Sequence, residues 1–376
     1  MQKETACVHA GSYHDAATGG VNTPIFTSSS FEYLDRDEVL YPRLFNTPNQ
    51  SAVVQKLCAL EGAEDGLLFS SGMAAVSTTI LALVSPGEHV VLLDAVYGGT
   101  HALATEEFDR LGIEYSFAET DVDAIMRSVN PKTRLIVVES PTNPLLGIVD
   151  LRRLAELASS RGITTVADNT FASPVSQNPL SLGIDVVLHS GTKYIGGHSD
   201  LCCGAALTSV DLAARIRATA HNLGGSVNAF TCSLIERSLK TLAVRVERQV
   251  QNAARIAEFL NAHSSVRTVN YPGLPDSPGH ETAKSQMRGF GAMLSFELDS
   301  DDGPGAFLRR LQLITPALSL GGVESLICSP AETSHERMSP AERQRAGVTD
   351  DLLRLSVGIE HVDDLIADLS QAFAAP

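Results

Sequence analysis

The chain is poor in aromatic residues, in basic residues and in long apolar runs. It has no tryptophan, and aromatic residues make up 5% of its 376 residues. No uninterrupted run reaches the roughly 18 apolar residues of a membrane-spanning helix, and the opening MQKETACVHAGSYHD has no apolar signal core. The 28 lysines and arginines stand against 44 acidic residues, a formal net charge of −16. We therefore expect no nucleic-acid or membrane partner and a cytoplasmic location.

The cysteines form neither a metal-binding nor a disulfide pattern. The six are Cys7, Cys58, Cys202, Cys203, Cys232 and Cys328. No Cys-x-x-Cys pair occurs, and two of the six are adjacent, a spacing that suits neither a zinc knuckle nor a disulfide framework. We expect them to be reduced and mostly buried, and we predict no metal site.

What the chain does contain is a regular alternation of short apolar runs and helical stretches. The runs are GLLF (66–69), HVVLLD (89–94), RLIVVE (134–139), ITTVAD (163–168) and DVVLH (185–189). This alternation is typical of βαβ units. We therefore predict an α/β fold with a mostly parallel central sheet and helices on both of its faces.

The regions before and after this alternation differ from it. Residues 1–45 lack periodicity, which indicates an extended arm. Apolar residues recur every three or four positions from Leu239 to Leu260, which predicts one long helix leading to a second lobe. GFGAMLSFEL and DLLRLSVGIE would be strands of that lobe, and VDDLIADLSQAF its terminal helix. We expect an arm (1–45), a main domain (46–245) and a smaller α+β domain (246–376).

Polar residues and glycines follow the predicted strands at their carboxyl ends, where ligands bind to open parallel sheets. In chain order they are Ser70, Ser71, Gly72 and Met73; Tyr97; Glu139 and Asn143; Asp168 and Asn169; and Ser190, Thr192 and Lys193. A phosphate-binding P-loop places its glycines before the lysine, whereas here hydroxyls precede Lys193 and glycines follow it. A nucleotide-binding protein is therefore the least favoured interpretation.

A phosphate group would suit two of these strand ends. The backbone amides of Gly72 and Met73 begin a predicted helix, where N–H groups and the helix dipole attract an anion. The hydroxyls of Ser190 and Thr192 could donate to the same group. We predict that these four residues bind a phosphate.

The other strand ends suit the rest of one molecule. An aromatic ring would stack on Tyr97, a protonated ring nitrogen would face Asp168, and an aldehyde would be held by Lys193 as a Schiff base. These are the requirements of pyridoxal 5′-phosphate (PLP). Taken singly, such a lysine is usually solvated and such an aspartate usually caps a helix, so the prediction depends on the agreement among the strand ends.

The residues around Lys193 also resemble a known family. VADNTFASPVSQNPLSLGIDVVLHSGTKYIGGHSD (166–200) is similar to the Cys/Met-metabolism family of PLP enzymes, which includes cystathionine γ-synthases, cystathionine γ- and β-lyases, methionine γ-lyases and O-acylhomoserine sulfhydrylases. The similarity also takes in VHAG, SSGMAAV, YGGT, ESPTNP, SLGGVESL and LLRLSVGIE. It implies an aspartate aminotransferase-like fold (fold type I), with 46–245 as the PLP-binding domain.

The resemblance implies roles for further residues. Lys193 would shuttle protons as well as hold the cofactor, with Tyr97 and Asp168 as the other catalytic groups. The planar guanidinium of Arg354 would bind the substrate α-carboxylate. Three further residues would line the substrate site: Ser319, Asn143 and Leu318.

The arm is expected to serve a neighbouring subunit. The resemblance implies that Tyr41 and Arg43 complete the phosphate site of another chain, and that the protein is a homotetramer of two active dimers. In the family Asn-Pro-Thr usually follows the arm's arginine, whereas this chain has Asn46-Thr47-Pro48. We expect this order to shift the loop that approaches the neighbouring site.

The implied reaction is γ-elimination or γ-replacement on a sulfur amino acid or homoserine ester, of the cystathionine γ-lyase or γ-synthase type. Leu318 stands where those enzymes commonly have glutamate, which favours an apolar substrate tail and a methionine γ-lyase. Gly99, where methionine γ-lyases have cysteine, and the GGVESL run favour the cystathionine enzymes. An acylhomoserine sulfhydrylase, an aminotransferase and a non-enzymatic cofactor-binding regulator remain as alternatives.

Overall fold

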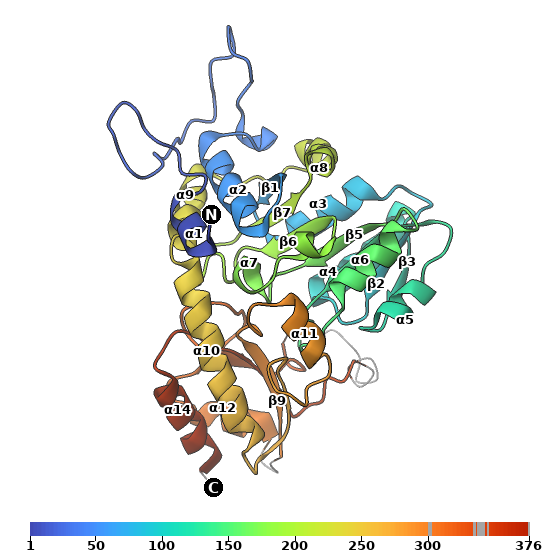
Figure 1. Cartoon of the computed structure of the whole chain (residues 1–376), viewed down its shortest axis with the longest axis vertical. Helices are drawn as coiled ribbons and strands as arrows, with labels where there is room; N and C mark the ends of the chain where they lie inside the picture. The colour runs from blue at the N-terminus through green and yellow to red at the C-terminus, as the bar shows by residue number, and fades with distance from the viewer. Residues whose placement is uncertain (300–302, 334–335, 337–342, 344–345, 375–376) are drawn as a thin grey trace.

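The computed structural model describes residues 1–299, 303–333, 336, 343 and 346–374. The predicted C-terminal domain, 246–376, therefore includes some residues outside the described part of the chain. Two sheets organise what is described, one of seven strands and one of five. In Figure 1 the larger sheet lies in the upper half of the molecule and the smaller one below it.

The larger sheet is mostly parallel, as predicted. Its strand order is β1-β7-β6-β5-β4-β2-β3. The bounds are β1 Asp65–Phe69, β2 His89–Leu93, β3 Glu114–Ala118, β4 Thr133–Glu139, β5 Thr164–Asp168, β6 Val186–Ser190 and β7 Gly204–Thr208. β7 runs antiparallel to both of its neighbours, β1 and β6. Strands β3 and β7 were not predicted from the sequence.

Alternation along the strands builds a hydrophobic core on each face of this sheet. In β2, Val90 and Leu92 pack in a cluster with α3 (Gly72–Leu83), α4 (Gly98–Leu111) and α8 (Val210–Leu223). Their neighbours Val91 and Leu93 pack on the opposite face with α5 (Val122–Arg127) and α6 (Leu151–Ser159). Because successive side chains point to opposite faces, a strand covered on both sides is apolar throughout. The predicted two-sided helical cover is confirmed.

The link to the second lobe differs from the prediction of one helix starting at Leu239. α9 (Ala229–Leu239) ends there, and α10 (Leu242–Asn261) begins three residues later. The Ser238 carbonyl accepts hydrogen bonds from the Thr241 backbone (3.2 Å) and from the Arg245 guanidinium (3.0 Å), and these bonds end the regular helical pattern at the junction. From this break α10 runs along the molecule to the smaller domain (Figure 1).

The smaller domain is built on a sheet of order β10-β11-β12-β9-β8. Its strands are β8 Val266–Asn270, β9 Met293–Leu298, β10 Thr315–Pro316, β11 Leu326–Cys328 and β12 Leu352–Ser356, and its helices are α11 His280–Gln286, α12 Gly303–Arg310 and α14 Val362–Ala374. The predicted strands in GFGAMLSFEL and DLLRLSVGIE correspond to β9 and β12, and the terminal helix to α14. These three predictions are confirmed.

The arm is not extended throughout. α1 (Lys3–His9) packs on α2 (Pro48–Glu61) and α10 of its own chain. The buried Lys56 ammonium caps this helix by donating to the carbonyls of Cys7 (3.1 Å) and Val8 (3.3 Å). Beyond it the chain forms projecting loops (Figure 1), on which several apolar side chains are exposed.

The departure at Asn46-Thr47-Pro48 has a structural role. Thr47 and Gln50 form a reciprocal capping box at the start of α2, with Pro48 as its first residue. The Asn46 side chain accepts from the Tyr41 backbone N–H (3.0 Å) and donates to the Val39 carbonyl (2.9 Å). The three residues thus fasten the end of the arm to a helix.

In the described part of the chain, the other short helices are α7 (Ser173–Ser176) and two 3-10 turns, Pro42–Leu44 and Pro179–Leu182. Five of the six cysteines are buried, as predicted, and Cys202 is exposed. Among the described residues, no helix has the length and apolar character needed to cross a membrane.

Candidate active site

The carboxyl ends of three adjacent strands bring the predicted residues together. β4, β5 and β6 are neighbours in the large sheet. Glu139 and Asp168, the last residues of β4 and β5, are paired in register, and β6 ends at Ser190. The turn after Ser190 carries Lys193, whose backbone N–H donates to the Ser190 carbonyl at 3.2 Å. Parallel strands thus deliver their terminal residues to one edge of the sheet.

Lys193 points from the large domain toward the smaller one. Its Nζ lies 2.8 Å from Oγ of Ser319, a residue of the segment between β10 and β11. Burial lowers the pKa of Lys193, and the charge of Arg354 lowers it further. A lysine in such surroundings releases its proton more readily than a solvated one, as a base requires.

Arg354 joins the two domains at the same place. It is buried in β12, where Nη1 donates to Asn143 Oδ1 (2.8 Å) and Nη2 to the Ser319 carbonyl (3.4 Å). Ser319 has a backbone φ of 99°, in the region that favours glycine. This conformation directs its carbonyl to Arg354 and its hydroxyl to Lys193. Arg354 therefore contacts two other predicted substrate residues, Ser319 and Asn143.

Two carboxyl groups lie beneath this contact. Asp168 Oδ1 accepts from the backbone (3.0 Å) and the hydroxyl (2.5 Å) of Thr170, while burial raises its pKa above the ordinary value. Glu139 Oε2 accepts from the Tyr97 backbone N–H at 2.8 Å. Burial, and then the charge of Asp168, raise the pKa of Glu139 well above its ordinary value. Both residues border a small cavity beside α3.

The four predicted phosphate residues surround the start of α3. Ser71 caps this helix by accepting from the Ala74 N–H (3.1 Å). A Cβ built on Gly72 would lie 2.8 Å from Ser190 Cβ, so only glycine allows this approach. Thr192 lies two residues after Ser190, and its hydroxyl accepts from the backbone N–H of Cys203 (3.1 Å).

Tyr97 and Met73 approach each other over Gly99. A Cβ built on Gly99 would lie 2.6 Å from Cε1 of Tyr97 and 2.9 Å from Sδ of Met73. The Tyr97 ring therefore lies over the start of α4 and close to the start of α3, and half of its surface is exposed. Its role in stacking on a cofactor ring stays a prediction.

The remaining predicted residues lie differently. Tyr41 is 45% exposed, with the Arg43 guanidinium carbon 5.9 Å from its ring centroid. Arg43 also donates to the His221 carbonyl at the end of α8. These contacts are separate from Lys193, so service to a neighbouring subunit stays a prediction. Leu318, next to Ser319, is 60% exposed.

Comparisons with known proteins agree with this geometry. Residues 4–374 match the family described as Cys/Met metabolism PLP-dependent enzyme. The chain belongs to this family. It is similar to cystathionine beta-lyase MetC of Bacillus subtilis, with 45% identity over 98% of this chain and 95% of the relative. It is also similar to the cystathionine gamma-lyase of that organism, with 43% identity over 99% of both chains.

A solved structure extends the comparison to the fold. Cystathionine gamma-lyase from Lactobacillus plantarum, complexed with L-serine, superposes with a TM-score of 0.96. The two are 40% identical, over 100% of this chain and 99% of the other. The predicted aspartate aminotransferase-like architecture is confirmed.

The side chains present fit the cofactor of the family. Lys193 offers an amine whose pKa is lowered, and Asp168 offers a partly buried carboxyl for a ring nitrogen. Gly72 leaves room for the start of α3 to lie against Ser190, so that backbone amides and a hydroxyl face the same space. This donor set matches the amine-reactive group, the ring and the phosphate of PLP.

Proposed function

We propose that this chain catalyses γ-elimination or γ-replacement on a sulfur amino acid or homoserine ester, as a cystathionine γ-lyase or γ-synthase does. The observation that carries the proposal is the convergence on Ser319 of Lys193 (2.8 Å to its hydroxyl) and Arg354 (3.4 Å to its carbonyl). A base and a cation that can bind a carboxylate thus contact the same residue. Chemistry at the α-carbon of an amino acid requires both groups close together.

The cofactor would be held by residues of the large domain. When bound, PLP supplies an aldehyde that condenses with amines and a ring that withdraws electrons from the substrate. Asp168 would face the ring nitrogen and Tyr97 would cover the ring. The phosphate would be bound by Gly72, Met73, Ser190 and Thr192.

The chain's own groups would bind the substrate and move its protons. Arg354 would bind the α-carboxylate through both of its terminal nitrogens, taking over from the Asn143 and Ser319 contacts. Lys193, with its lowered pKa, would accept the proton from Cα and return one at the end. The Ser319 hydroxyl, in contact with Nζ, would orient the amine between these steps.

A neighbouring subunit would complete the site. We propose a homotetramer of two active dimers, in which Tyr41 and Arg43 of one chain bind the phosphate in another. The arm favours this assembly because its loops leave Val21, Tyr33, Leu34 and Val39 largely exposed. Exposed apolar side chains gathered on one segment are typical of an interaction surface.

Leu318 supports a second candidate, a methionine γ-lyase. Its side chain is exposed beside Ser319, so it would contact the substrate tail. An amino group there would find no carboxylate on Leu318, whereas an apolar thioether would find a matching surface. Leu318 thus favours the second candidate, whereas Gly99 and the GGVESL run favour the first.

Product analysis distinguishes the readings. Purified protein is incubated with L-cystathionine and with L-methionine, and the products are measured by mass spectrometry. Cysteine and 2-oxobutyrate from cystathionine are expected, whereas homocysteine and pyruvate would show β-cleavage. Methanethiol and 2-oxobutyrate from methionine, with cystathionine untouched, would establish the second candidate. Conversion of an amino acid to its keto acid without release of ammonia would instead indicate an aminotransferase.

The lysine assignment is tested separately. We expect Lys193→Ala to lower turnover by a factor of about 10² to 10⁴, the usual contribution of a general base. Lys240→Ala is the matched control, because Lys240 is a lysine whose ammonium contacts the Asn22 side chain, outside the site. Full activity in Lys193→Ala would refute the assignment.

A further inference from the structure

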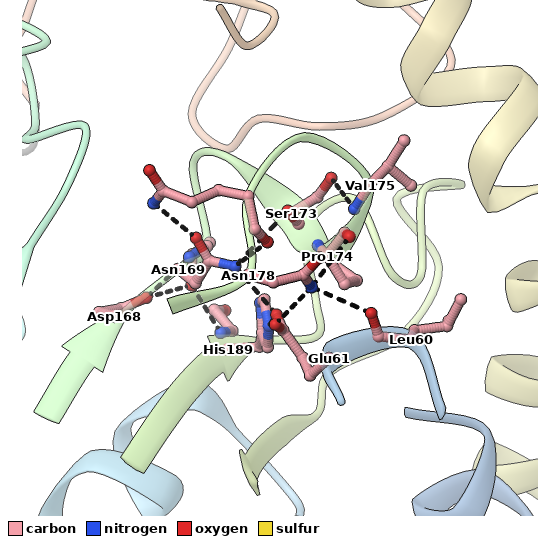
Figure 2. A network of polar contacts seen from close by, with 12 residues as sticks. Leu60, Glu61, Asp168, Asn169, Ser173, Pro174, Val175, Asn178 and His189 are labelled. Atoms are coloured by element: carbon pink, nitrogen blue, oxygen red, sulfur yellow. Dashed lines mark hydrogen bonds and ion pairs between the residues drawn. The ribbon is translucent and has the colours of Figure 1, made fainter. Parts of the chain in front are cut away.

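A buried carboxylate with three donors lies behind Asp168. Glu61, the last residue of α2, accepts from His189 Nε2 (2.6 Å) and Asn169 Nδ2 (2.9 Å) on Oε1. Its Oε2 accepts from Asn178 Nδ2 at 2.9 Å. The Glu61 side chain has no exposed surface, and that of His189 is 2% exposed. Figure 2 shows these residues in one network, with Asp168 at its edge.

The orientation of both amides is fixed from their other ends. Gln177 Nε2 donates to Asn169 Oδ1 (3.0 Å), and Arg288 Nη2 donates to Asn178 Oδ1 (2.7 Å). With their oxygens used as acceptors, both amides must present N–H groups to Glu61. The carboxyl therefore faces donors on both oxygens, an environment that favours its ionised form.

A buried carboxylate needs a countercharge. The group that contacts Glu61 most closely is His189, and breaking such a pair leaves an unpaired charge in the interior. Lys3 is a second cation in this region, with its ammonium 2.6 Å from the Leu60 carbonyl. With Nε2 2.6 Å from Oε1, the imidazole of His189 is placed to supply this charge when it is protonated.

His189 connects this pair to the cofactor site. It follows Leu188, which pairs with Asp168 across β5 and β6, and in Figure 2 it lies between Asp168 and Glu61. Asn169, bonded to Glu61, is the residue directly after Asp168. The same carboxylate thus contacts the side chain of the residue after Asp168 and the His189 ring.

We propose that Glu61 and His189 form a buried ion pair that positions Asp168 and keeps it ionised opposite the ring nitrogen of the cofactor. Burial raises the pKa of Asp168 overall, while the hydrogen bonds from Thr170 and then the charge of His189 act in the opposite direction. Glu61 and His189 are positioning residues, since they act through Asp168. The role of Glu61 and His189 toward the cofactor rests on the proposed function. The existence of their ion pair does not depend on that function.

Nuclear magnetic resonance on the full-length protein tests the ion pair directly. With ¹⁵N-labelled histidine at pH 7.5, the signals that disappear in His189→Asn identify this residue. We expect the shifts of an imidazole protonated on both nitrogens in the wild type, and of a neutral ring in Glu61→Gln. A neutral His189 in the wild type would overturn the proposal. Should Glu61→Gln fail to fold, the wild-type spectrum still decides.

The effect on the cofactor is measured as the dissociation constant for PLP. We expect Glu61→Gln to weaken PLP binding about tenfold, because a neutral Asp168 makes a weaker hydrogen bond than an ionised one. Glu61→Asp keeps the charge and is expected to recover part of the loss. The matched control is Asp368→Asn, which removes a buried carboxylate that accepts from three backbone N–H groups in the smaller domain.

The outcomes separate the proposals. Equal loss of PLP affinity in Glu61→Gln and Asp368→Asn would show general destabilisation and refute the positioning role, as would unchanged affinity in Glu61→Gln. A wild-type chain that binds no PLP would refute the proposed function and the role toward the cofactor. The histidine spectrum would in that case still report whether the ion pair exists.

Discussion

Two buried glutamates flank Asp168, and their surroundings give them opposite properties. Glu61 and Glu139 are 2% and 4% exposed. Burial alone would raise the pKa of Glu61, but the hydrogen bond and charge of His189, with the amides of Asn178 and Asn169, lower it overall. Burial and the charge of Asp168 raise that of Glu139 instead. Donors and neighbouring charges, rather than burial, decide which carboxyl is ionised.

The largest expected effect on stability is that of replacing Glu61. Replacing it by Gln puts an amide N–H₂ against groups that are themselves donors and leaves His189 without its anion. We expect Glu61→Gln to lower the free energy of unfolding by about 3–5 kcal/mol, the usual cost of breaking a buried pair. Urea unfolding at pH 7 measures it. A loss similar to that in Glu139→Gln would remove the contrast between the two glutamates.

Acid should reduce the difference in stability between the wild type and Glu61→Gln. The folded-state pKa of Glu61 lies below its ordinary value of 4.5. Its contribution is therefore fully present above pH 4.5 and is lost as pH falls through the folded-state pKa. We expect the stability gap between wild type and Glu61→Gln to narrow below about pH 4. A gap that stays constant from pH 7 to pH 3 would contradict an ionised Glu61.

A double-mutant cycle measures the coupling within the pair. Glu61→Gln and His189→Asn are combined, and unfolding free energies are compared with those of the single variants. We expect a coupling of about 1–3 kcal/mol, as for residues in one hydrogen-bonded network. Glu139→Gln combined with His189→Asn serves as the control and is expected to be nearly additive.

The smallest effect is expected at Glu139. A Gln oxygen can accept the Tyr97 N–H as the carboxyl does, so Glu139→Gln should change stability by no more than about 1 kcal/mol at pH 4, where the wild-type carboxyl is protonated. Since the folded-state pKa of Glu139 is raised, the wild type should lose stability as pH rises above the ordinary value of 4.5. The Glu139→Gln variant should lack this loss of stability when its unfolding free energy is measured from pH 4 to pH 8.

The sequence predicted the edge of the sheet well because strand ends of a parallel sheet converge by topology alone. Asp168 and Lys193 could be placed there without coordinates, and the resemblance added Arg354 and Ser319 from the other domain. Strand β7 was missed because GAALT contains one glycine and two alanines, residues that are depleted in strands. The break before α10 was missed because the apolar spacing continues across Lys240 and Thr241, where hydrogen bonds, not hydrophobicity, end the helix.

The Glu61 network could not be predicted in this way. Glu61 ends a helix, 128 positions before its partner His189, and nothing in the pattern of either segment points to the other. Glu139 was noticed at a strand end, but its bond to the Tyr97 backbone depends on the course of the turn after β2. Pairings between distant segments require the packed structure.

The capping box at Thr47 has a mechanical consequence. It fixes the first turn of α2, whose 14 residues form a rod about 20 Å long that ends at Glu61. Asn46, directly before the box, holds the backbone of Tyr41 in the arm. Tyr41 of the arm is thus connected, through Asn46 and the capping box, to the rigid helix that carries the carboxylate behind Asp168.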